Sequence, residues 1–413
     1  MRTRFILILA FLPTVWALSQ TYTLDDCCRM ALENNRTLTS TRMDVEKAVE
    51  DEREAFTAYF PEISATGAVF QGAHHLIQEM SLVKKGAIAS VSAVQPVFAG
   101  GKIVNKNKLA KIQHEVSKLQ YELTEKEIIQ RCAEIYWLIV SLRANIATLD
   151  AADRHLAEMM RQTKDNVEAG IRLPADTMRI RLKQSELKSS RLSIDNALNL
   201  NMMSLANLIG AEWTGFAIAD MTFSMPEYPV SSYISPDDAV YNRREYVLSQ
   251  KQLEASRYQL RMEQGKLLPS LGIGVAGMYA NLMEKGETNM LVFASLSIPI
   301  SAWWGGSHAI KKARLNRKQA EIAMEDIRLD LRIDIQHAWD NTVEAYQQIL
   351  IAHDALQVAE ENLRMNGDYY ESGTINISDF LDAENMFIQN SDNLTTAYAT
   401  YQIRLADYKR KVE

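Results

Sequence analysis

Few side chains in this sequence are spaced as a reactive or metal-binding site requires. His74 and His75 are adjacent, but no cysteine or cluster of carboxylates stands near them, so a solvated loop is a better interpretation than a metal site. The sequence Gly272-Ile273-Gly274 falls in a predicted strand with no helix after it, which argues against a phosphate-binding loop. We therefore expect no catalytic residue, no cofactor and no metal, and interpret the chain as non-enzymatic.

Two carboxylates do have a spacing with a physical consequence. Asp379 and Asp382 are three residues apart in a predicted helix, so they share a face about one turn from each other. Gathered around a symmetry axis, such carboxylates would favour cations, repel anions and bind protons more tightly through like-charge repulsion. The alternative is a helix that begins at Ser378 and Asp379, where acidic residues are favourable. The two roles are compatible.

The three cysteines are too few for a disulfide scaffold. Cys27 and Cys28 are adjacent and cannot easily bridge each other, and Cys132 lies inside a helical pattern. We interpret them as small apolar residues in helices.

Charge and targeting signals narrow the class of protein. The 413-residue chain carries a net charge of −7 and has no basic patch, so we expect no nucleic-acid partner. Residues 1–19 are typical of a signal peptide, with Arg2 and Arg4 before a short apolar core and a cleavage site near Gln20. No later run of about 18 apolar residues is evident, so we expect no membrane-spanning helix and any span must be a closed barrel.

The placement of Gly and Pro predicts long helices, because helix interiors exclude both residues. The chain is free of both over segments that cover about two thirds of its length, far more than the usual one third in helices. In each half, two shorter segments together contain nearly as many residues as the long one. This predicts two short helices stacked end to end beside one long helix. The segments are 24–60, 102–169, 175–209, 237–264, 307–366 and 378–413.

Apolar residues in the long segments step by three and four, the spacing of an antiparallel coiled-coil seam. The first seam is predicted at Leu109, Ile112, Val116, Leu119, Leu123, Ile128, Cys132, Ile135, Ile139, Leu142, Ile146 and Leu149. The second is predicted at Ile335, Trp339, Val343, Tyr346, Leu350 and His353.

Four short stretches between the helices alternate in polarity and have the length of tilted membrane strands. Two polar loops, 74–86 and 282–289, join them in pairs. Four strands cannot close alone, and open edges are not tolerated in lipid, so several chains must share one barrel. The predicted strands are 62–73, 87–98, 270–281 and 290–301.

The second half of the chain repeats the first at an offset of about 203–208 residues, with breakers, hairpins and helix lengths in the same order. We predict a signal peptide at 1–19, a first structural repeat at 20–210 with its hairpin at 62–98, a mid-height linker at 211–235, and a second repeat at 236–413 with its hairpin at 270–301.

At this point the mature chain resembles TolC-type outer-membrane efflux proteins over essentially its whole length. No single motif is specific for this family, but the ordered combination of the motifs is. The motifs are Leu24-Asp25-Asp26, Ala31-Leu32-Glu33-Asn34-Asn35, Tyr59-Phe60-Pro61, Gln95-Pro96-Val97-Phe98-Ala99-Gly100-Gly101 and Gly373 to Ala383.

The resemblance implies a passive exit duct in the outer membrane with a periplasmic extension. It implies a homotrimer with a shared twelve-stranded β-barrel, docked on a periplasmic adaptor protein and an inner-membrane transporter for efflux or type I secretion. Two alternatives of other classes are the periplasmic adaptor itself, which also uses a long helical hairpin, and a structural coiled-coil protein. An adaptor should flank one hairpin with soluble β-domains, whereas this chain has two hairpin units and ends in a helix.

The resemblance also implies roles for particular residues at the periplasmic entrance. The helices turn after Gly170 and Gly373, and Asp379 and Asp382 match positions that ring the narrowest aperture. Tyr370 and Asp176 match positions that hold the closed state.

One position departs from the family pattern. The more studied family members carry an arginine two residues after the glycine of the second repeat, and it ties the closed entrance to a neighbouring hairpin, whereas here Ile375 stands at that position. The first repeat has Arg172 at the equivalent place. We hypothesise that Arg172, with Asp176 or Tyr370, restrains the closed entrance.

Overall fold

The computed structural model describes residues 20–71, 85–212, 216–219, 223–282 and 285–412. The expected signal peptide at 1–19 and the histidines at 74 and 75 lie outside the described residues. Two units emerge from the chain contacts. The turn unit comprises residues 1–35, 128–231 and 341–407, and the sheet unit comprises 36–127, 232–340 and 408–413, each as far as it is described.

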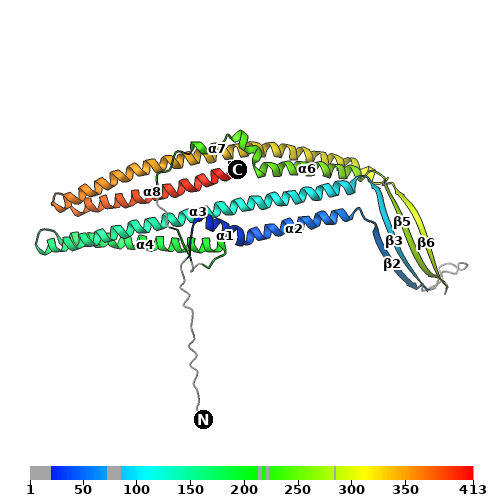
Figure 1. The fold of residues 1–413 in the computed structure, drawn as a ribbon, viewed down its shortest axis with the longest axis horizontal. Helices are drawn as coiled ribbons and strands as arrows, with labels where there is room; N and C mark the ends of the chain where they lie inside the picture. Colours follow the sequence, from blue (N-terminus) through cyan, green and yellow to red (C-terminus); the bar gives the residue numbers. More distant parts are fainter. Residues whose placement is uncertain (1–19, 72–84, 213–215, 220–222, 283–284, 413) are drawn as a thin grey trace, which may run out of the picture. The chain divides into compact units, whose positions relative to one another are not determined.

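Long helices make up most of the described chain and follow one order in both halves (Figure 1). The helices are α1 Leu24–Asn34, α2 Arg36–Thr57, α3 Lys102–Glu168, α4 Pro174–Ile209, α5 Pro236–Ala239, α6 Arg244–Gly265, α7 Ala302–Glu371 and α8 Ile377–Val412. Two 3-10 turns are η1 Pro229–Ser232 and η2 Val240–Asn242. The strands are β1 Gln20–Tyr22, β2 Glu62–Gln71, β3 Lys85–Ala99, β4 Phe216–Ile218, β5 Ser270–Leu282 and β6 Lys285–Ser297.

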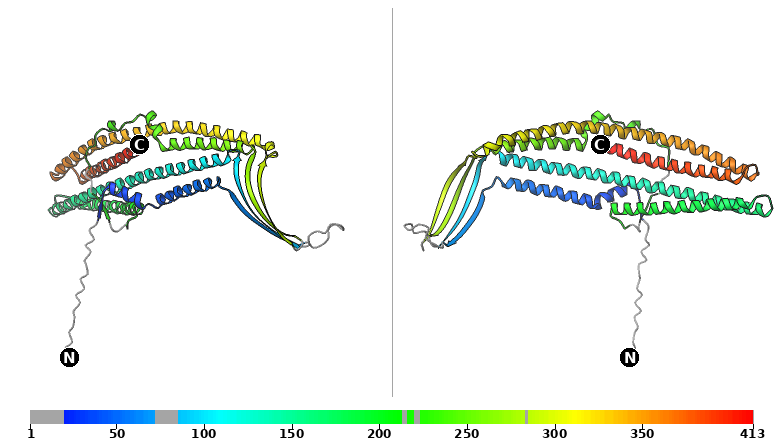
Figure 2. Two further views of the ribbon diagram at one scale, coloured as in Figure 1. Left: turned by 45° about the vertical axis from the view of Figure 1, so that its right-hand side comes forward. Right: turned by 180° about the vertical axis from the view of Figure 1, so that it is seen from behind.

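In the turn unit, each long helix lies beside a shorter one of the same repeat (Figures 1 and 2). The second part of α3 is joined to α4 by an ion pair between Asp150 and Arg191. The second part of α7 is joined to α8 by a hydrogen bond of 3.2 Å from Thr342 Oγ1 to the Arg404 carbonyl.

In the sheet unit, α2 lies beside the first part of α3, and α6 beside the first part of α7 (Figures 1 and 2). His114 Nδ1 of α3 is 2.9 Å from Glu52 Oε2 of α2. The two repeats also meet here, because Lys251 of α6 forms an ion pair of 2.6 Å with Glu115 of α3.

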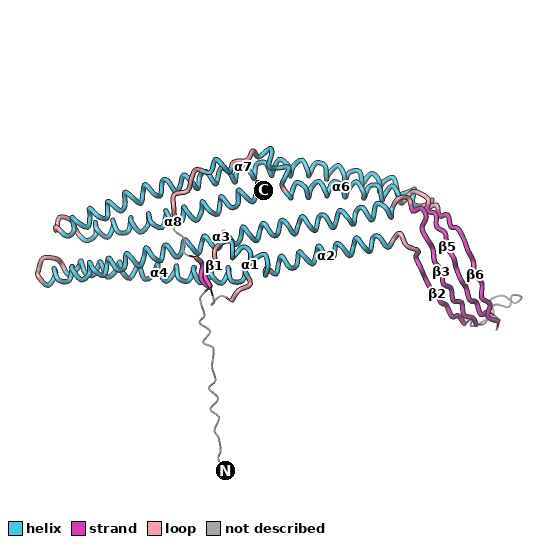
Figure 3. The backbone as a smooth tube through the Cα atoms, in the orientation of Figure 1, coloured by secondary structure: helices cyan, strands magenta, loops and turns pink. Residues whose placement is uncertain are grey.

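The four long strands form one antiparallel sheet in the order β2-β3-β5-β6 (Figure 3). The contact between β3 and β5 joins the two repeats directly, and β2 and β6 remain as edges. Cross-strand register places Ile63, Val275 and Val292 in one row and Ser64 opposite Ser92 in the next. The predicted alternation of side chains therefore holds across the sheet, with one mainly apolar face and one that carries hydroxyl groups.

The predicted strand limits were partly wrong. The second hairpin has strands up to Leu282 and again from Lys285, so most of the loop predicted at 282–289 pairs in the sheet. The last strand ends at Ser297 rather than continuing to residue 301. Residues such as Glu287 and Thr288 look like loop residues by composition, but they lie opposite Ala280 and Tyr279 of β5, and that pairing decided the outcome.

Two segments predicted as single helices are broken. The segment 24–60 divides at Asn35, whose backbone is extended with ψ 126°, and the segment 237–264 divides at Arg243 with ψ 131°. Neither break contains Gly or Pro. The absence of those residues therefore permits a continuous helix but does not require one.

The first coiled-coil seam was predicted correctly at most positions, because seven of its twelve residues are buried: Ile112, Val116, Ile128, Cys132, Ile135, Ile139 and Leu149. In the second seam Ile335 was predicted correctly, and the predicted positions from Trp339 to Leu350 lie one residue after the buried ones. Along the middle of α7, from 331 to 349, the buried residues are Leu331, Ile335, Ala338, Thr342, Ala345 and Ile349, whereas Leu350 is 43% exposed. Small residues that carry little hydrophobic signal thus supply part of the seam, while the larger predicted residues Trp339 and Tyr346 are partly buried and pack beside it.

Two features were not foreseen. The short strands β1 and β4 pair in parallel, with Thr21 opposite Ala217. One described helix, α3, also contains an 18-residue window of mean hydropathy 1.2. Half of that window is buried within the protein, which is what a core helix shows, so it is weak evidence for a membrane span.

Candidate functional site

The two helical turns of the turn unit have the same backbone. α3 ends before Gly170, at φ 74°, and α7 ends before Gly373, at φ 79°. At each turn the glycine N–H and the next N–H donate back to the helix, to the carbonyls of Val167 and Asn166 in the first turn and of Tyr370 and Tyr369 in the second. This Schellman arrangement requires a left-handed residue, which glycine adopts without steric cost.

The helices that follow the two turns begin differently. α4 begins with Pro174 after Leu173, which offers no side-chain cap. α8 begins after Asn376, whose side-chain oxygen accepts hydrogen bonds of 2.7 and 3.1 Å from the backbone N–H groups of Ser378 and Asp379. Our alternative interpretation of Ser378 and Asp379 as the helix start was therefore wrong by two residues, since Asn376 is the cap and Asp379 lies in the first turn.

Arg172 of the first turn lies against Tyr370 at the end of α7. Its guanidinium donates a hydrogen bond to the Tyr370 carbonyl and lies 4.3 Å from the centre of the tyrosine ring. The Tyr370 hydroxyl is 3.1 Å from Thr163 Oγ1 of α3. Tyr370 is therefore held by two groups of the first repeat, one on its backbone and ring face and one on its hydroxyl.

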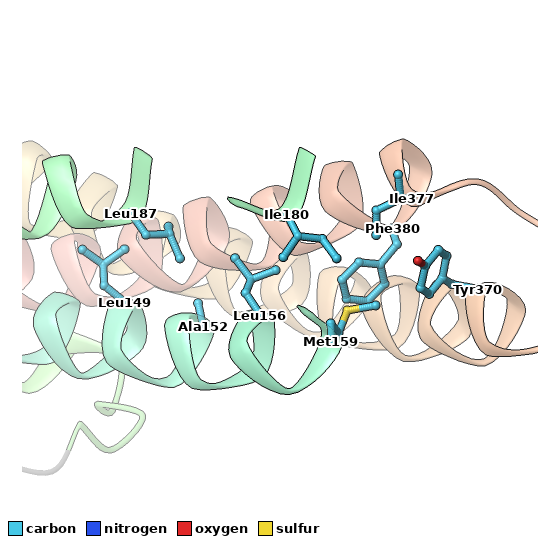
Figure 4. Packing of buried hydrophobic residues seen from close by; sticks show 9 residues of the cluster. All are labelled: Leu149, Ala152, Leu156, Met159, Ile180, Leu187, Tyr370, Ile377 and Phe380. Atoms are coloured by element: carbon cyan, nitrogen blue, oxygen red, sulfur yellow. The ribbon is translucent and has the colours of Figure 1, made fainter. Parts of the chain in front are cut away.

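Tyr370 is only 6% exposed and belongs to an apolar cluster built by both repeats (Figure 4). Its ring packs 5.9 Å from Phe380 of α8, centre to centre. The cluster comprises Leu149, Ala152, Leu156, Met159, Ile180, Leu187, Tyr370, Ile377 and Phe380, with Ile375 partly buried against it.

Polar contacts continue from this cluster along the line where the two repeats meet, which we call the repeat seam. Its members join α3, α4 or their turn to α7 or α8. The pairs are Arg172–Tyr370, Thr163–Tyr370, Arg179–Ser378, Lys183–Asn385, His155–Glu384, Thr148–Ser391 and Asn145–Asp392.

His155 and Glu384 form the most buried ionisable pair of the seam. Glu384 is 1% exposed, and one of its oxygens is 3.0 Å from His155 Nδ1. The hydrogen bond to this carboxylate raises the pKa of His155, and burial opposes the rise in part. The imidazole also packs edge-on to Phe380 at 5.6 Å.

The remaining predicted site residues do not take part in the contact between Arg172 and Tyr370. Asp379 and Asp382 are exposed on α8, while Phe380 and Ala383 between and beside them are buried. Asp176 lies half-buried in the first turn of α4. Within the described part of the chain, no hydrogen bond or ion pair joins the Asp176 side chain to Arg172 or Tyr370. The structure thus brings Arg172 to Tyr370 and leaves Asp176 out of that contact.

The sequence reasoning missed Thr163, His155, Arg179, Lys183 and Glu384 as site residues. Each finds its partner in the other repeat, roughly two hundred positions along the chain. Only the capping residue Asn376 had a local signal, an asparagine three positions before an acidic residue at a helix start.

Comparison with known families identifies the chain. The family described as "Outer membrane efflux protein" matches residues 28–211 and again residues 236–407. This chain belongs to that family. The two matched ranges are the two repeats, and TolC-family channels form trimers.

Individual relatives in this family are distant but cover nearly the whole chain. Outer membrane protein TolC of Vibrio cholerae is 20% identical over 409 residues, which cover 96% of this chain and 91% of the relative. Outer membrane efflux protein BepC of Brucella suis is 20% identical and covers 95% of this chain and 84% of its own length. The outer membrane channel CmeC of Campylobacter jejuni has a similar structure, with a TM-score of 0.83 at 17% identity, covering 94% of this chain and 85% of that one.

Membership in the efflux family confirms the function class predicted from the sequence. The protein is an outer-membrane efflux channel with a periplasmic extension and is not an enzyme. The alternatives of a periplasmic adaptor and of a structural coiled-coil protein are thereby excluded.

Proposed function

We propose that three copies of this chain form a homotrimeric exit duct that accepts substrates from an inner-membrane transporter through a periplasmic adaptor protein. In this assembly the strands cross the outer membrane and the long helices extend into the periplasm. The duct is passive, and the transporter selects the cargo, for efflux or for type I secretion.

The observation that carries this proposal is the open four-stranded sheet. Its edge strands β2 and β6 have no partner strand within the described chain. Unpaired backbone groups are not tolerated in hydrocarbon, so each edge needs the edge of another copy. Three sheets joined β2 to β6 would close a twelve-stranded barrel, in agreement with the trimers of TolC-family channels.

The two faces of the sheet also support a place in a membrane barrel. Val69 is 87% exposed, Val292 72% and Ile63 73%, all on the face that carries no hydroxyl pair. On the other face Thr66 Oγ1 lies 2.7 Å from Ser90 Oγ. We assign the apolar face to outer-membrane lipid and the hydroxyl face to the lumen.

A native-mass measurement of the detergent-extracted protein tests the assembly. We expect a particle of three chains that conducts ions in planar bilayers. A monomer without channel activity would contradict the proposal.

We further propose that the repeat seam holds the two helical turns together and keeps the periplasmic entrance closed. Arg172 contributes by fixing Tyr370, and Asp176 acts by its charge near the start of α4 rather than through a contact with Arg172. The Arg172→Ala variant should raise single-channel conductance. Arg181→Ala removes an exposed arginine from α4 and serves as the matched control. Equal conductance of both variants and the wild-type channel would refute the role of Arg172.

The third part of the proposal concerns Asp379 and Asp382. Both are exposed beside the second turn, where threefold symmetry would bring six carboxylates around one aperture. The double variant Asp379→Asn with Asp382→Asn should lose cation preference and block by multivalent cations. Asp44→Asn with Asp51→Asn makes the same charge change at exposed positions of α2. Loss of selectivity in the control pair instead would place the aperture elsewhere.

A further inference from the structure

The long helical segments of the sheet unit follow one another in the order α2-α3-α6-α7, the same order as their strands (Figure 1). Polar contacts join α2 to α3 and α3 to α6, and Leu267, just after α6, accepts a hydrogen bond of 3.0 Å from Trp303 of α7. Within the described sheet unit, α2 and α7 are therefore the edge helices, as β2 and β6 are the edge strands. The same two edges would meet in the proposed trimer, because α2 leads into β2 and α7 follows β6.

The first part of α7 is strongly basic. Between Ala302 and Ala320 it has no acidic residue, and the first carboxylate is that of Glu321. No ion pair within the described chain involves any of the exposed basic and imidazole side chains of this stretch. They are His308, Lys311, Lys312, Arg314, Arg317 and Lys318.

Some of these cations share a face of α7 with exposed apolar residues. Ala320 lines the groove between α7 and α6, and Lys318 and Ile322 are each two positions from it, which places them on the opposite side of the helix. Lys311 and Leu315 lie on the same face, one heptad earlier. Leu315 and Ile322 are both more than half exposed. The face of α7 turned away from α6 therefore combines positive charge with apolar surface that the chain itself does not cover.

The outward face of α2 is acidic. Glu46 and Glu50 are each two positions from the buried Ala48, so they lie on the side of the helix away from it. Glu54 lies one turn further along this face, and Met43 lies one turn before Glu46. All four of these outward residues are exposed. The two edge helices thus carry opposite charge.

We propose that the acidic face of α2 in one copy packs against the basic and apolar face of α7 in the next copy, and that this contact selects the correct neighbour. The proposal rests on the trimer proposed above and names the surface by which its copies recognise each other. Glutamates meet lysines, while Met43 packs on the apolar stripe of Leu315 and Ile322. Complementary charge at such a contact acts on the choice of partner and on the rate of association.

The contact between the two repeats inside one chain indicates the level at which the two faces meet. In the repeat, α7 corresponds to α3 and α2 corresponds to α6. Within the chain, Lys251 of α6 lies 2.6 Å from Glu115 of α3. Shifted by the repeat offset, this level falls at Met43 on α2 and at Ala320 on α7.

This level brings the opposite charges of the two copies together. α2 runs toward the sheet and α7 runs away from it, so Glu50 of one copy comes within about one helical turn of Lys311 of the next. Glu46 comes equally close to Lys318. Within its own helix Glu50 pairs with Arg53 at 2.6 Å, but both side chains stay mostly exposed, so this pair contributes little and leaves Glu50 available.

The charges of the proposed contact have the opposite sense to those inside the chain. Where α3 meets α6, Glu115 and Glu122 of α3 pair with Lys251 and Arg244 of α6. On the edges, the counterpart of α3 is basic and the counterpart of α6 is acidic. A copy that placed its α2 beside α3 of another chain would bring carboxylates against carboxylates, which disfavours that wrong pairing. The reversal therefore favours the join of β6 to β2 over exchange of a hairpin between copies.

Charge reversal in the full-length protein tests the contact. Lys311→Glu with Lys318→Glu should raise the rate of subunit exchange between tagged and untagged trimers at least about tenfold, because like charges then face each other. The addition of Glu46→Lys and Glu50→Lys to the same chain should return the rate to within about threefold of the wild-type value, because the pairs are restored with reversed sense.

A matched control and three outcomes decide the proposal. Lys106→Glu with Lys118→Glu makes the same charge change at exposed positions of α3 and should leave the exchange rate unchanged. A wild-type exchange rate in the α7 double variant would overturn the proposal and leave the trimer standing, and so would failure of the α2 changes to restore the rate. If that variant exchanges normally but loses copurified anionic phospholipid, the basic stretch binds lipid and the proposal is wrong. A monomeric wild-type protein would refute the channel assembly itself.

Cross-linking supplies a second measurement without charge reversal, in case a reversed variant fails to fold. Glu50→Cys with Lys311→Cys, treated with a short bismaleimide, should give covalent species of two and three chains on a denaturing gel. Lys106→Cys with Lys311→Cys should give single chains, because α6 stands between α3 and α7, and the treated parent protein sets the baseline. Single chains only from the first pair, in a protein that is trimeric by native mass, would overturn the proposal.

Discussion

The two helical turns of this channel protein have one backbone and two different sets of side chains. Both place a left-handed glycine after a long helix and close it with the same pair of hydrogen bonds. Two residues after the glycine, the first turn has Arg172, which reaches across to Tyr370. The second turn has Ile375 at that position, partly buried against the apolar cluster.

The difference shows that the two copies of a duplicated unit use different side chains to stabilise their turns. The second turn is capped within its own repeat by Asn376, and Ile375 packs against the apolar cluster that both repeats build. The first turn has no side-chain cap, and its arginine contacts the other repeat instead. Between the two turns, the contact with Tyr370 is made by the Arg172 side chain of the first turn, and this asymmetry can be tested by substitution.

Removal of the Tyr370 ring should have the largest effect on the stability of the two turns. Tyr370→Ala leaves a cavity in the shared cluster and should lower the free energy of opening around both turns by about 3–5 kcal/mol. Tyr370→Phe loses only the contact with Thr163 and should cost about 1 kcal/mol. Amide hydrogen exchange over residues 163–180 and 366–382 of the full-length protein measures both. Equal losses would mean that the ring itself contributes little.

Loss of the arginine should come next. Arg172→Ala removes a hydrogen bond and a cation–π contact and should cost about 1–2 kcal/mol by the same exchange measurement. Arg172→Lys keeps the charge without the planar guanidinium and should recover only part of the loss. Full recovery by lysine would show that charge alone, rather than the stacked geometry, fixes Tyr370.

Substitution of Gly170 and of Gly373 should lower stability equally, because the role of each glycine is confined to the backbone. Alanine at Gly170 or Gly373 should each cost about 1–2 kcal/mol through the left-handed conformation. An added Cβ meets no atom within 4 Å at Gly170, and at Gly373 the nearest atom is the Arg172 Nη2 at 4.0 Å. Gly305→Ala, in the regular helix α7 with open space around it, should be stabilising. A much larger loss at Gly373 would indicate that the second turn depends on the arginine.

A pH dependence should be the smallest effect. The pKa of His155 is raised in the folded protein by Glu384, so its contribution is complete below the unfolded value of about 6.5 and is lost as pH rises through the higher folded value. The free energy of opening the seam should therefore be lower above that range. The decrease should be less than about 1 kcal/mol because His155 is half exposed. His155→Gln should flatten the exchange profile. A wild-type profile that is already flat would refute the contribution.

Some elements were predictable because their signals are local. The period of the apolar residues and the positions of Gly and Pro predicted α3 and α4, and the alternation of side chains predicted four strands. The repeat at an offset of 203 residues predicted that Asp176 and Asp379 are equivalent, and both lie in the first turn of the helix after their glycine. The register of the α7 seam failed because Ala338, Thr342 and Ala345 carry too little hydrophobic signal.

The sequence by itself determined the helical repeats, the hairpins and the family, since each depends on spacing along the chain. Only the tertiary structure decided that Arg172 contacts Tyr370 rather than Asp176 and that His155 pairs with Glu384. These partners are a hundred or more residues apart, and their meeting depends on how helices pack rather than on any periodicity. A local pattern states which face of a helix is buried, but the neighbour on that face is chosen by the fold.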